Sequence, residues 1–522
     1  MFKRIGLIAL LLSLLTIACA AADGASTVRS YSELLKAVNE YGCTDITISA
    51  DYKHGTEGVG QSLHGTGTVT IHPEEQGEVT LLGRFDVSGG TLVFERISLQ
   101  GSPAMTALWV GGGAKVTVQD VTGGESTKAI GGCGVAACGG AEVHVRKATG
   151  GYGKSFGGDG VYAYDDANVV VEEALGGASA TYGGSGVVCW QAQVTVTRGA
   201  TGGDGKRLGG QGLLQGVSSS VMLLGTAKDG QGSGSVPEKA ASYGDLLRKL
   251  RDGETDITLA PAYKHGTATK LDKPWFVATK GTVTVRCAPT KKTAVLSGRV
   301  SLCGGSFVLE GLTIAPPTGE AALVAAADTQ VQLKGSLTAK GAGLSILCAD
   351  DAAAQVTGTL KGVACVTDRA SLTVTGDIGH TAKSKSCLLV TDSAQARVVG
   401  DLTGQAQLEG SARLTVTGSL NGLTGTNALR CAGDAQAEIT GDLSSKAKDA
   451  PTLSAADSAS VRIDGSVTAT AKTNAIVAEG TSTVTVTGSV SGGTSAESLP
   501  TVWQAGERVT IGGTVSGAVY TK

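Results

Sequence analysis

The chain has 522 residues, which is longer than a single hydrophobic core usually supports. Its 79 glycines with only 10 prolines exclude a collagen helix, and its 41% hydrophobic content excludes a disordered chain. The formal net charge of −3 lacks the basic excess expected of a nucleic-acid-binding protein.

Residues 1–22 have the pattern of an export signal peptide. Basic residues at positions 3 and 4 precede an apolar run over residues 5–17, and small residues follow it. The apolar run is too short to span a membrane. The stretch Thr-Ile-Ala-Cys at residues 16–19 is also similar to a bacterial lipobox, which makes Cys19 a candidate for lipidation; plain secretion is the favoured alternative. Both alternatives predict a secreted or cell-surface protein, which meets a membrane only through such a lipid anchor.

A first repeated unit is expected over residues 27–228. It opens with an amphipathic helix at residues 31–38, followed by a strand at residues 44–48. Further along, the pattern Gly-Gly-x-Gly-(Val/Leu) begins every 26 residues, at Gly131, Gly157, Gly183 and Gly209. Alternating strand patterns lie between these elements, as at residues 143–145 and 169–171. A fixed period of this kind predicts coils of chain stacked on one another.

Residues 229–242 have the composition of a flexible linker, and a second copy of the unit follows over residues 243–522. Its opening helix is predicted at residues 243–250. Residues 255–259 match residues 44–48, and Tyr-Lys-His-Gly-Thr at residues 52–56 recurs at residues 263–267. The chain is therefore predicted to consist of two homologous units in tandem.

A shorter period runs through the second unit. The pattern Gly-x-(Leu/Ile/Val) recurs there, with mostly apolar residues two and four places before each Gly and a small residue six places before most of them. This alternation predicts strands with one face in a narrow core and the other in solvent. The glycines are Gly335, Gly358, Gly376, Gly400, Gly418, Gly441, Gly465, Gly488 and Gly513.

Eleven cysteines in an exported chain raise the question of disulfides. Five of them lie in apolar, strand-like runs, namely Cys189, Cys348, Cys365, Cys387 and Cys431. This favours packed thiols, because a buried cysteine behaves as a small hydrophobic residue. Cys133 and Cys138 are the best candidates for a bridge. The sequence has no Cys-x-x-Cys pair, which argues against a structural zinc site.

With its helix-then-strand openings at residues 31–48 and 243–259 and the Val-x-Val-x-Gly coils after them, the chain resembles the right-handed parallel β-helix, or pectin-lyase-like, superfamily, in an adhesin-like or uncharacterised branch. The resemblance covers nearly all of the chain after the signal segment. It implies an all-β fold of two tandem right-handed parallel β-helices with short N-terminal capping helices. That superfamily includes polysaccharide lyases, hydrolases and adhesins, so the resemblance alone leaves the activity open.

The best candidate binding face lies on the outer loops of the first unit. Lys128, Lys154 and Lys206 recur three places before the Gly-Gly element, and Phe156 and Tyr182 directly precede it in two of the coils. Stacked coils would place these residues in a basic stripe beside an aromatic stripe, a surface suited to an acidic polysaccharide. The favoured alternative is that the apolar column packs inward and the lysines are only solvated.

Two further patterns have a functional and a structural interpretation. Asp350, Asp368, Asp392 and Asp457 each lie eight places before a repeat Gly, where calcium is the one cofactor that the carboxylates suggest. Gly occupies the same place in other coils, so a left-handed turn is favoured over a calcium site. A turn is likewise favoured over a catalytic role for His54 and His265.

No set of residues predicts catalysis. The Asn-Thr-Asp, Asp-Asp, Gly-His-Gly and Arg-Ile-Lys strings of hydrolases that the resemblance brings to mind do not occur here as a set. We therefore expect a non-enzymatic, adhesin-like or glycan-binding protein, whose partner is an extracellular polysaccharide or a host or cell-surface glycan. The alternative is a polysaccharide lyase or glycoside hydrolase acting on an acidic polysaccharide.

Overall fold

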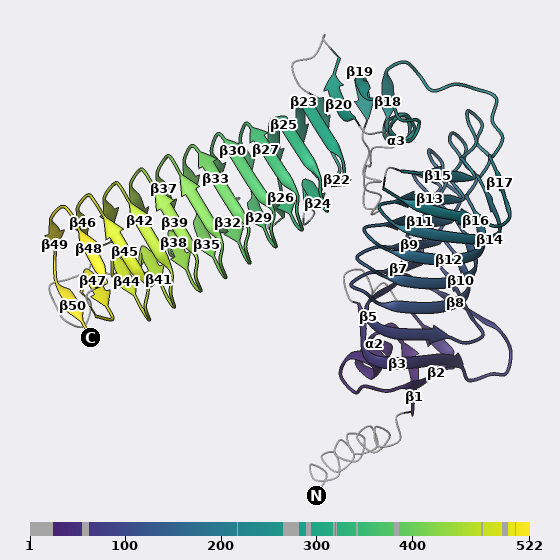
Figure 1. Cartoon of the computed structure of the whole chain (residues 1–522), viewed down its shortest axis with the longest axis horizontal. Coiled ribbons are helices and arrows are strands. Elements are labelled where there is room, and N and C mark those ends of the chain that lie inside the picture. Colours follow the sequence, from purple (N-terminus) through teal and green to yellow (C-terminus); the bar gives the residue numbers. More distant parts are fainter. Residues whose placement is uncertain are drawn as a thin grey trace, which may run out of the picture. The chain divides into compact units, whose positions relative to one another are not determined.

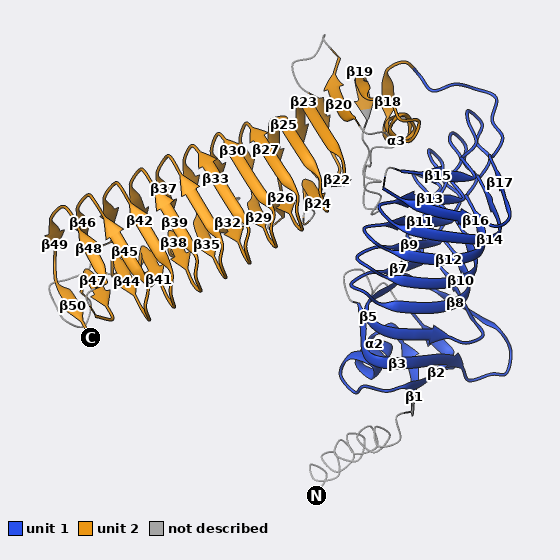
Figure 2. Ribbon diagram, in the orientation of Figure 1, with its two compact units in different colours: residues 1–237 blue, residues 238–522 orange. Residues whose placement is uncertain are grey.

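The computed structural model describes residues 25–54, 62–216, 218–264, 281–288, 294–316, 319, 321–340, 343–379, 386–470, 473–492, 500–506 and 508–522. The predicted signal peptide, Cys19 and His265 lie outside these residues. The described chain is a right-handed parallel β-solenoid of about 18 turns, which confirms the predicted fold class. It divides into two compact units, the first ending at Pro237 and the second beginning at Glu238 (Figure 2).

The first unit is a stack of strands joined by parallel pairing from coil to coil (Figure 1). Its strands are β1 (Ala25–Ser30), β2 (Asp45–Lys53), β3 (Leu63–Pro73), β4 (Val79–Leu82), β5 (Phe85–Phe94), β6 (Ile97–Gln100), β7 (Leu108–Val110), β8 (Lys115–Thr122), β9 (Val135–Ala137), β10 (Glu142–Thr149), β11 (Val161–Tyr164), β12 (Asn168–Leu175), β13 (Val187–Trp190), β14 (Gln193–Thr201), β15 (Leu213–Gln215), β16 (Ser220–Leu223) and β17 (Thr226–Lys228).

The second unit begins with β18 (Ala240–Ser242), β19 (Asp256–Lys264), β20 (Thr282–Cys287), β21 (Ala294–Leu296), β22 (Val300–Cys303), β23 (Ser306–Ile314), β24 (Leu323–Ala326), β25 (Gln330–Thr338), β26 (Leu344–Cys348), β27 (Ala353–Thr357), β28 (Leu360–Lys361), β29 (Val363–Val366), β30 (Ser371–Thr375), β31 (Ile378–Gly379), β32 (Ser386–Val390), β33 (Gln395–Val399), β34 (Leu402–Thr403) and β35 (Gln405–Leu408).

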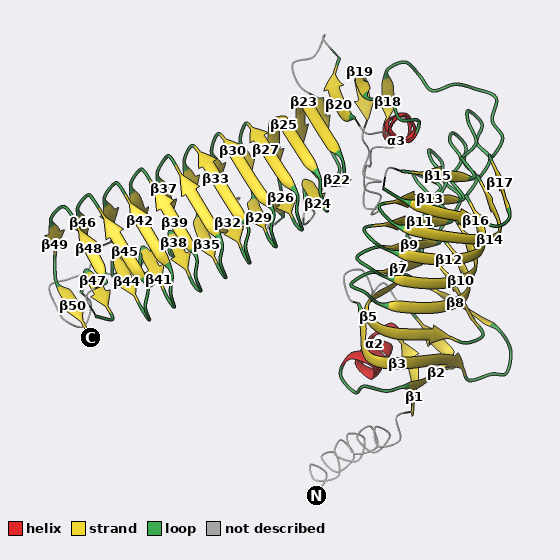
Figure 3. Cartoon of the chain, in the orientation of Figure 1, coloured by secondary structure: helices red, strands yellow, loops and turns green. Residues whose placement is uncertain are grey.

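It continues with β36 (Arg413–Val416), β37 (Leu420–Gly422), β38 (Leu429–Cys431), β39 (Gln436–Ile439), β40 (Leu443–Ser445), β41 (Leu453–Ala455), β42 (Ser460–Ile463), β43 (Val467–Thr468), β44 (Ile476–Ala478), β45 (Thr483–Val486), β46 (Val490–Ser491), β47 (Val502–Gln504), β48 (Val509–Ile511), β49 (Val515–Ser516) and β50 (Val519–Thr521). Strands thus make up almost all of the regular structure in both units (Figure 3).

Each unit opens with a helix, α2 (Tyr31–Asn39) in the first and α3 (Tyr243–Arg251) in the second. The predicted helices were each one residue shorter at the C-terminal end. In α3, the Ser242 hydroxyl accepts from the amide of Asp245, and the Asp245 carboxylate accepts from the amide of Ser242, a capping box that fixes where the helix begins. Neither helix in the described part of the chain has the length and apolarity to cross a membrane.

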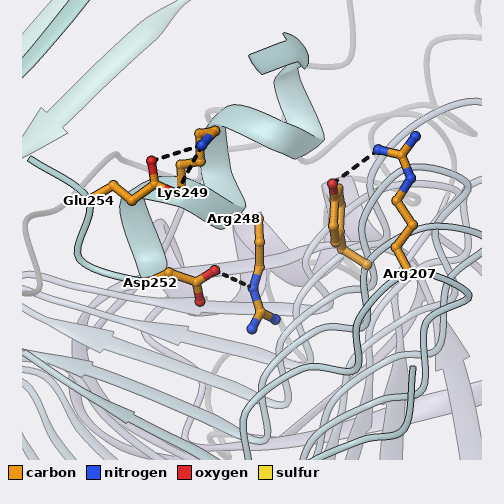
Figure 4. A network of polar contacts seen from close by, with 6 residues as sticks. Arg207, Arg248, Lys249, Asp252 and Glu254 are labelled. Carbon is orange, nitrogen blue, oxygen red and sulfur yellow. Dashed lines mark hydrogen bonds and ion pairs between the residues drawn. The ribbon is translucent and has the colours of Figure 1, made fainter. Parts of the chain in front are cut away.

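Ion pairs secure the C-terminal end of α3. Arg248 Nε donates to an Asp252 carboxylate oxygen at 3.0 Å, and Lys249 Nζ donates to Glu254 at 2.8 Å (Figure 4). Lys249 is buried, with a side chain only 5% exposed, so its charge needs this partner.

The repeat columns predicted for the second unit form its core. The register pairs Leu372 with Ala396, Ala396 with Leu414, and Leu414 with Ala437, so residues at the same place in successive coils stack directly. Their side chains are buried, as are the small residues two places before them, such as Ala394 and Ala412. Coil-to-coil stacking of small and branched side chains therefore fills the narrow interior, as the period predicts.

The predicted aspartate column is a column of left-handed turns. Asp350, Asp368, Asp392 and Asp457 have φ between 57° and 60°, and glycines at the same place in other coils, such as Gly410, are also left-handed. Each carboxylate accepts from the amide of the turn residue in the preceding coil, for example from Ala327 at 2.8 Å and from Gly433 at 2.9 Å. The turn interpretation is thus confirmed, and the carboxylates are engaged by backbone groups.

The glycine-rich loops of the first unit pack backbone against backbone. Amides and carbonyls of glycines at 124, 132, 151, 158, 177 and 184 form a continuous chain of hydrogen bonds of 2.8–2.9 Å that crosses from loop to loop. A Cβ on Gly184 would lie 1.9 Å from the carbonyl oxygen of Gly158, so this approach admits no side chain. The loops therefore form a rigid layer beside the coils.

Candidate functional site

The predicted basic stripe lies on the tips of the glycine-rich loops. Lys128, Lys154 and Lys206 are exposed there, one in each of three loops. Acidic residues share the same tips, Glu125 and Asp204 being exposed as well. The tips are therefore mixed in charge.

Phe156 and Tyr182 do not form an exposed aromatic stripe. The two residues stack in register between Ile130 and Leu208, as predicted, but their side chains are 1% and 0% exposed. Tyr182 packs inward against Phe156 with 6.1 Å between ring centroids. Its hydroxyl accepts from Arg207 at 3.3 Å; Arg207 is labelled in Figure 4. The inward alternative is confirmed, and these rings offer no face to a ligand.

A hollow of the first unit lies elsewhere, on the outer face of the coils. We call it the first-unit groove; its volume is about 640 Å³. It crosses β5, β8, β10, β12 and β14, and strands about 4.8 Å apart make it roughly 19 Å long. The residues that line it are Val93, Phe94, Glu95, Arg96, Thr117, Val118, Gln119, His144, Val145, Arg146, Val170, Glu172 and Thr197.

Strand register explains why these residues meet. Val93 pairs with Thr117, Thr117 with His144, and His144 with Val170, so the outward residue of each coil falls in one row. The residues on either side, such as Val143 and Val145, point into the core. In the sequence, Thr117, His144 and Val170 are each the middle residue of a Val-x-Val strand. The sequence analysis predicted no site at these positions.

Cross-strand ion pairs hold the charged side chains of the groove in place. Asp120 accepts two hydrogen bonds from Arg146, from Nε at 2.9 Å and from Nη2 at 2.8 Å. On the next coils, Arg198 pairs with Glu172 at 3.1 Å. A bidentate pair restricts the guanidinium to one plane, so the groove presents oriented donors at its surface.

Arg96 has the most unusual backbone in the groove. Its φ of 56° lies in the left-handed region, which costs a residue with a long side chain free energy that Asp or Gly largely avoids. The matching position in the second unit, after a Glu in the corresponding strand, is Gly311 with φ of 64°. Arg96 therefore has a long side chain at a position whose left-handed backbone favours Gly, and Arg96 lines the groove.

His54 is part of the cap and not of the groove. Its ring is 7% exposed and lies between Tyr31 and Phe85, with centroids 4.3 and 4.5 Å away. Nε2 donates to the Arg84 carbonyl at 2.8 Å, and Nδ1 accepts from the Tyr52 hydroxyl at 3.2 Å. Burial lowers the pKa of His54 to about 4, so the ring is neutral at physiological pH.

The cysteines of the core are thiols in apolar surroundings. Burial raises the pKa of Cys348, Cys387 and Cys431 to about 12. Cys133, one of the two best candidates for a bridge, is buried, and its thiol donates to the carboxylate of the buried Asp159 at 3.8 Å. Within the described ranges, no cluster of three or more His, Cys, Asp or Glu residues is arranged to hold a metal ion.

The chain matches no protein-family model, no curated protein and no solved structure. The geometry of the first-unit groove and of the loop tips is therefore what any functional proposal for this protein must rest on.

Proposed function

We propose that this protein is an exported, non-enzymatic surface protein of the pectin-lyase-like type that binds an acidic extracellular polysaccharide or a cell-surface glycan. The binding site is the first-unit groove. One observation carries the proposal: a long, shallow hollow crosses several coils and is lined by hydroxyl, amide, imidazole, guanidinium and carboxylate groups beside aliphatic patches. An extended polymer that lies along the coils can meet each of these groups in turn.

The groove chemistry fits a carboxylate-bearing sugar polymer. Arg146 is oriented by Asp120, and Arg96 projects from a left-handed backbone, with its guanidinium donating to the Glu75 carbonyl at 3.4 Å. Thr117 and Gln119 supply hydrogen-bonding groups for sugar hydroxyls, and Val170 supplies an apolar patch for the face of a sugar ring.

Affinity chromatography and calorimetry on pectate, alginate and glycosaminoglycans, with and without calcium, test this proposal. Arg96→Gly should weaken binding about tenfold, as expected for a lost charge-assisted contact. It should leave the unfolding temperature unchanged or raise it, because the second unit has Gly at this position. A second variant, Arg146→Gln, should also weaken binding.

A triple Lys128→Ala, Lys154→Ala, Lys206→Ala variant is the matched control, because it removes exposed positive charges outside the groove. Its affinity should change by less than the affinity of Arg96→Gly. Loss of binding in the lysine variant alone would move the site to the loop tips. Release of unsaturated products that absorb in the ultraviolet would contradict the non-enzymatic assignment.

A further inference from the structure

The second unit has a groove on the face that corresponds to the first-unit groove. It crosses β20, β23, β25 and β27, has a volume of about 270 Å³, and is called here the second-unit groove. Val308 lines it, and Val93 lines the first-unit groove; each valine lies three residues after a Gly-Gly element, which places the two at equivalent positions. Its residues are Thr282, Ser306, Phe307, Val308, Gln330, Val331, Gln332, Ala353 and Gln355.

The outward rows of the two units carry different side chains, although Glu310 occupies in the second unit the position of Glu95 in the first. Along the outer row of the first unit, Val93, Thr117 and His144 stack in successive coils. The equivalent row of the second unit stacks Val308, Gln332 and Gln355. The neighbouring row changes in the same way.

In that neighbouring row, Lys115 and Glu142 form an ion pair of 2.8 Å in the first unit. Gln330 and Ala353 stack at the equivalent place in the second unit. The Arg96 position is Gly311. None of the residues that line the second-unit groove is ionisable.

The nearest charges beyond the second-unit groove neutralise each other. Lys334 and Glu310 lie two residues after Gln332 and Val308, and Lys334 donates to Glu310 at 2.8 Å. Gln330, Gln332 and Gln355 are exposed. The backbones of Gln332 and Gln355 belong to the parallel strand ladder, but within the described residues no hydrogen bond joins their side-chain amides to another group. These amides can therefore both donate to and accept from the hydroxyls of a ligand.

We propose that the second-unit groove is a separate binding site for a neutral, hydroxyl-rich polysaccharide. The inference rests on the proposed function, because it takes the outer face of the coils to be where glycans bind. The side-chain amides of Gln332 and Gln355, which lie opposite each other in register, hydrogen-bond to sugar hydroxyls. Val308 lies under a sugar ring. The two units thus divide the recognition of a mixed polymer between a charged groove and an uncharged one.

The test uses the full-length protein and five probes: galactomannan, xylan and dextran as neutral polymers, and pectate and alginate as acidic ones. The double variant Gln332→Ala, Gln355→Ala should bind the neutral polymers about tenfold more weakly, because it loses two hydrogen-bonding groups. Its affinity for pectate and alginate should equal that of the wild type.

Gln395→Ala is the matched control, since Gln395 is an exposed outward glutamine in the same sheet but outside the groove lining. It should bind every probe as the wild type does. Arg96→Gly should show the reverse selectivity, with weakened pectate and alginate binding and unchanged neutral binding.

The outcomes separate the two proposals. Binding of acidic polymers without binding of any neutral one overturns this inference and leaves the proposed function standing. Neutral binding that the double glutamine variant does not weaken overturns it as well. Neutral binding that the double variant does weaken, without acidic binding, supports this site and overturns the first-unit groove; no binding at all overturns both.

Discussion

At the scale of single residues, His54 makes the stability of the folded first unit depend on pH. Its pKa of about 4 in the folded protein lies below the ordinary value of about 6.5 in an unfolded chain. The unfolded chain therefore binds a proton that the folded protein does not bind, and stability falls as the pH drops from about 6.5 to about 4. The shift corresponds to a loss of up to about 3 kcal/mol over that window.

Urea unfolding of the wild type and of His54→Gln at several pH values measures this effect. The Gln side chain can still donate to the Arg84 carbonyl but does not titrate, so the variant should lose most of this pH dependence. His144→Gln removes an exposed imidazole and should keep the pH dependence of the wild type. Equal pH dependence in wild type and His54→Gln would contradict the assignment.

A second residue-scale prediction concerns a ladder of side chains along the second unit. Asp401 Oδ1 accepts from the amide of Ser419 at 2.7 Å, and the amide of Asp401 donates to Asp377 at 3.0 Å. Ser466 occupies the same place in a later coil, where its hydroxyl accepts from the amide of Ser489 at 3.2 Å. Any short side chain with an acceptor oxygen therefore serves this position.

Asp401→Ala should destabilise the second unit by about 1 kcal/mol, the net value of one hydrogen bond, while Asp401→Ser should be close to neutral. Asp434→Ala, at an exposed turn, is the control and should also be close to neutral. Chemical denaturation measures all three variants. If Asp401→Ser lost as much unfolding free energy as Asp401→Ala, the hydrogen bond from the Ser419 amide would not explain the stability at this position.

At the scale of elements, the glycine-rich loops depend on backbone contact. Gly184→Ala would place a methyl group 1.9 Å from the Gly158 carbonyl oxygen, so the layer has to open locally. We expect a loss of about 3 kcal/mol or more, because overpacking here pushes against backbone and not against a flexible side chain. Gly67→Ala is the control, since nothing lies within 4 Å of its added Cβ. Thermal unfolding compares the two; equal unfolding temperatures would contradict tight packing of the loops.

Much of the element structure could be predicted from the sequence, because it depends on period. The repeat Gly-x-(Leu/Ile/Val) predicted the stacked apolar column, and the register pairs Leu402 with Leu420 and Leu420 with Leu443. The period alone does not give the direction of Tyr182, since a buried row and an exposed row recur in the same way; the inward row was favoured and is confirmed.

The first-unit groove was missed for a different reason. It exists only where outward residues of several coils meet, and those residues differ in type from coil to coil, as Thr117, His144 and Val170 do. A period search finds what coils share and overlooks what distinguishes them. The left-handed backbone of Arg96 also has no sequence signature, because Arg is not a residue that usually adopts it.

At the scale of the whole molecule, each unit contains its own core and its own capping helix. We expect two transitions in scanning calorimetry, one for each unit. Leu414→Asp places a charge at a core position that is 2% exposed, and it should lower or abolish only the transition of the second unit. Arg413→Gln, at the neighbouring exposed position, should leave both transitions unchanged. A single transition that moves as a whole in Leu414→Asp would contradict independent units.

The hydrogen-bonded glycine layer has a consequence for how the surface of this protein can change. Main-chain hydrogen bonds between glycines and the buried Phe156 and Tyr182 rings hold neighbouring loops together, while the lysine side chains at the loop tips are exposed. Mutations at Lys128, Lys154 or Lys206 therefore meet little resistance from folding, and a lineage can vary these positions rapidly under selection. The same property makes the layer a natural scaffold for randomised libraries, with variety introduced at the turns and the glycines left untouched.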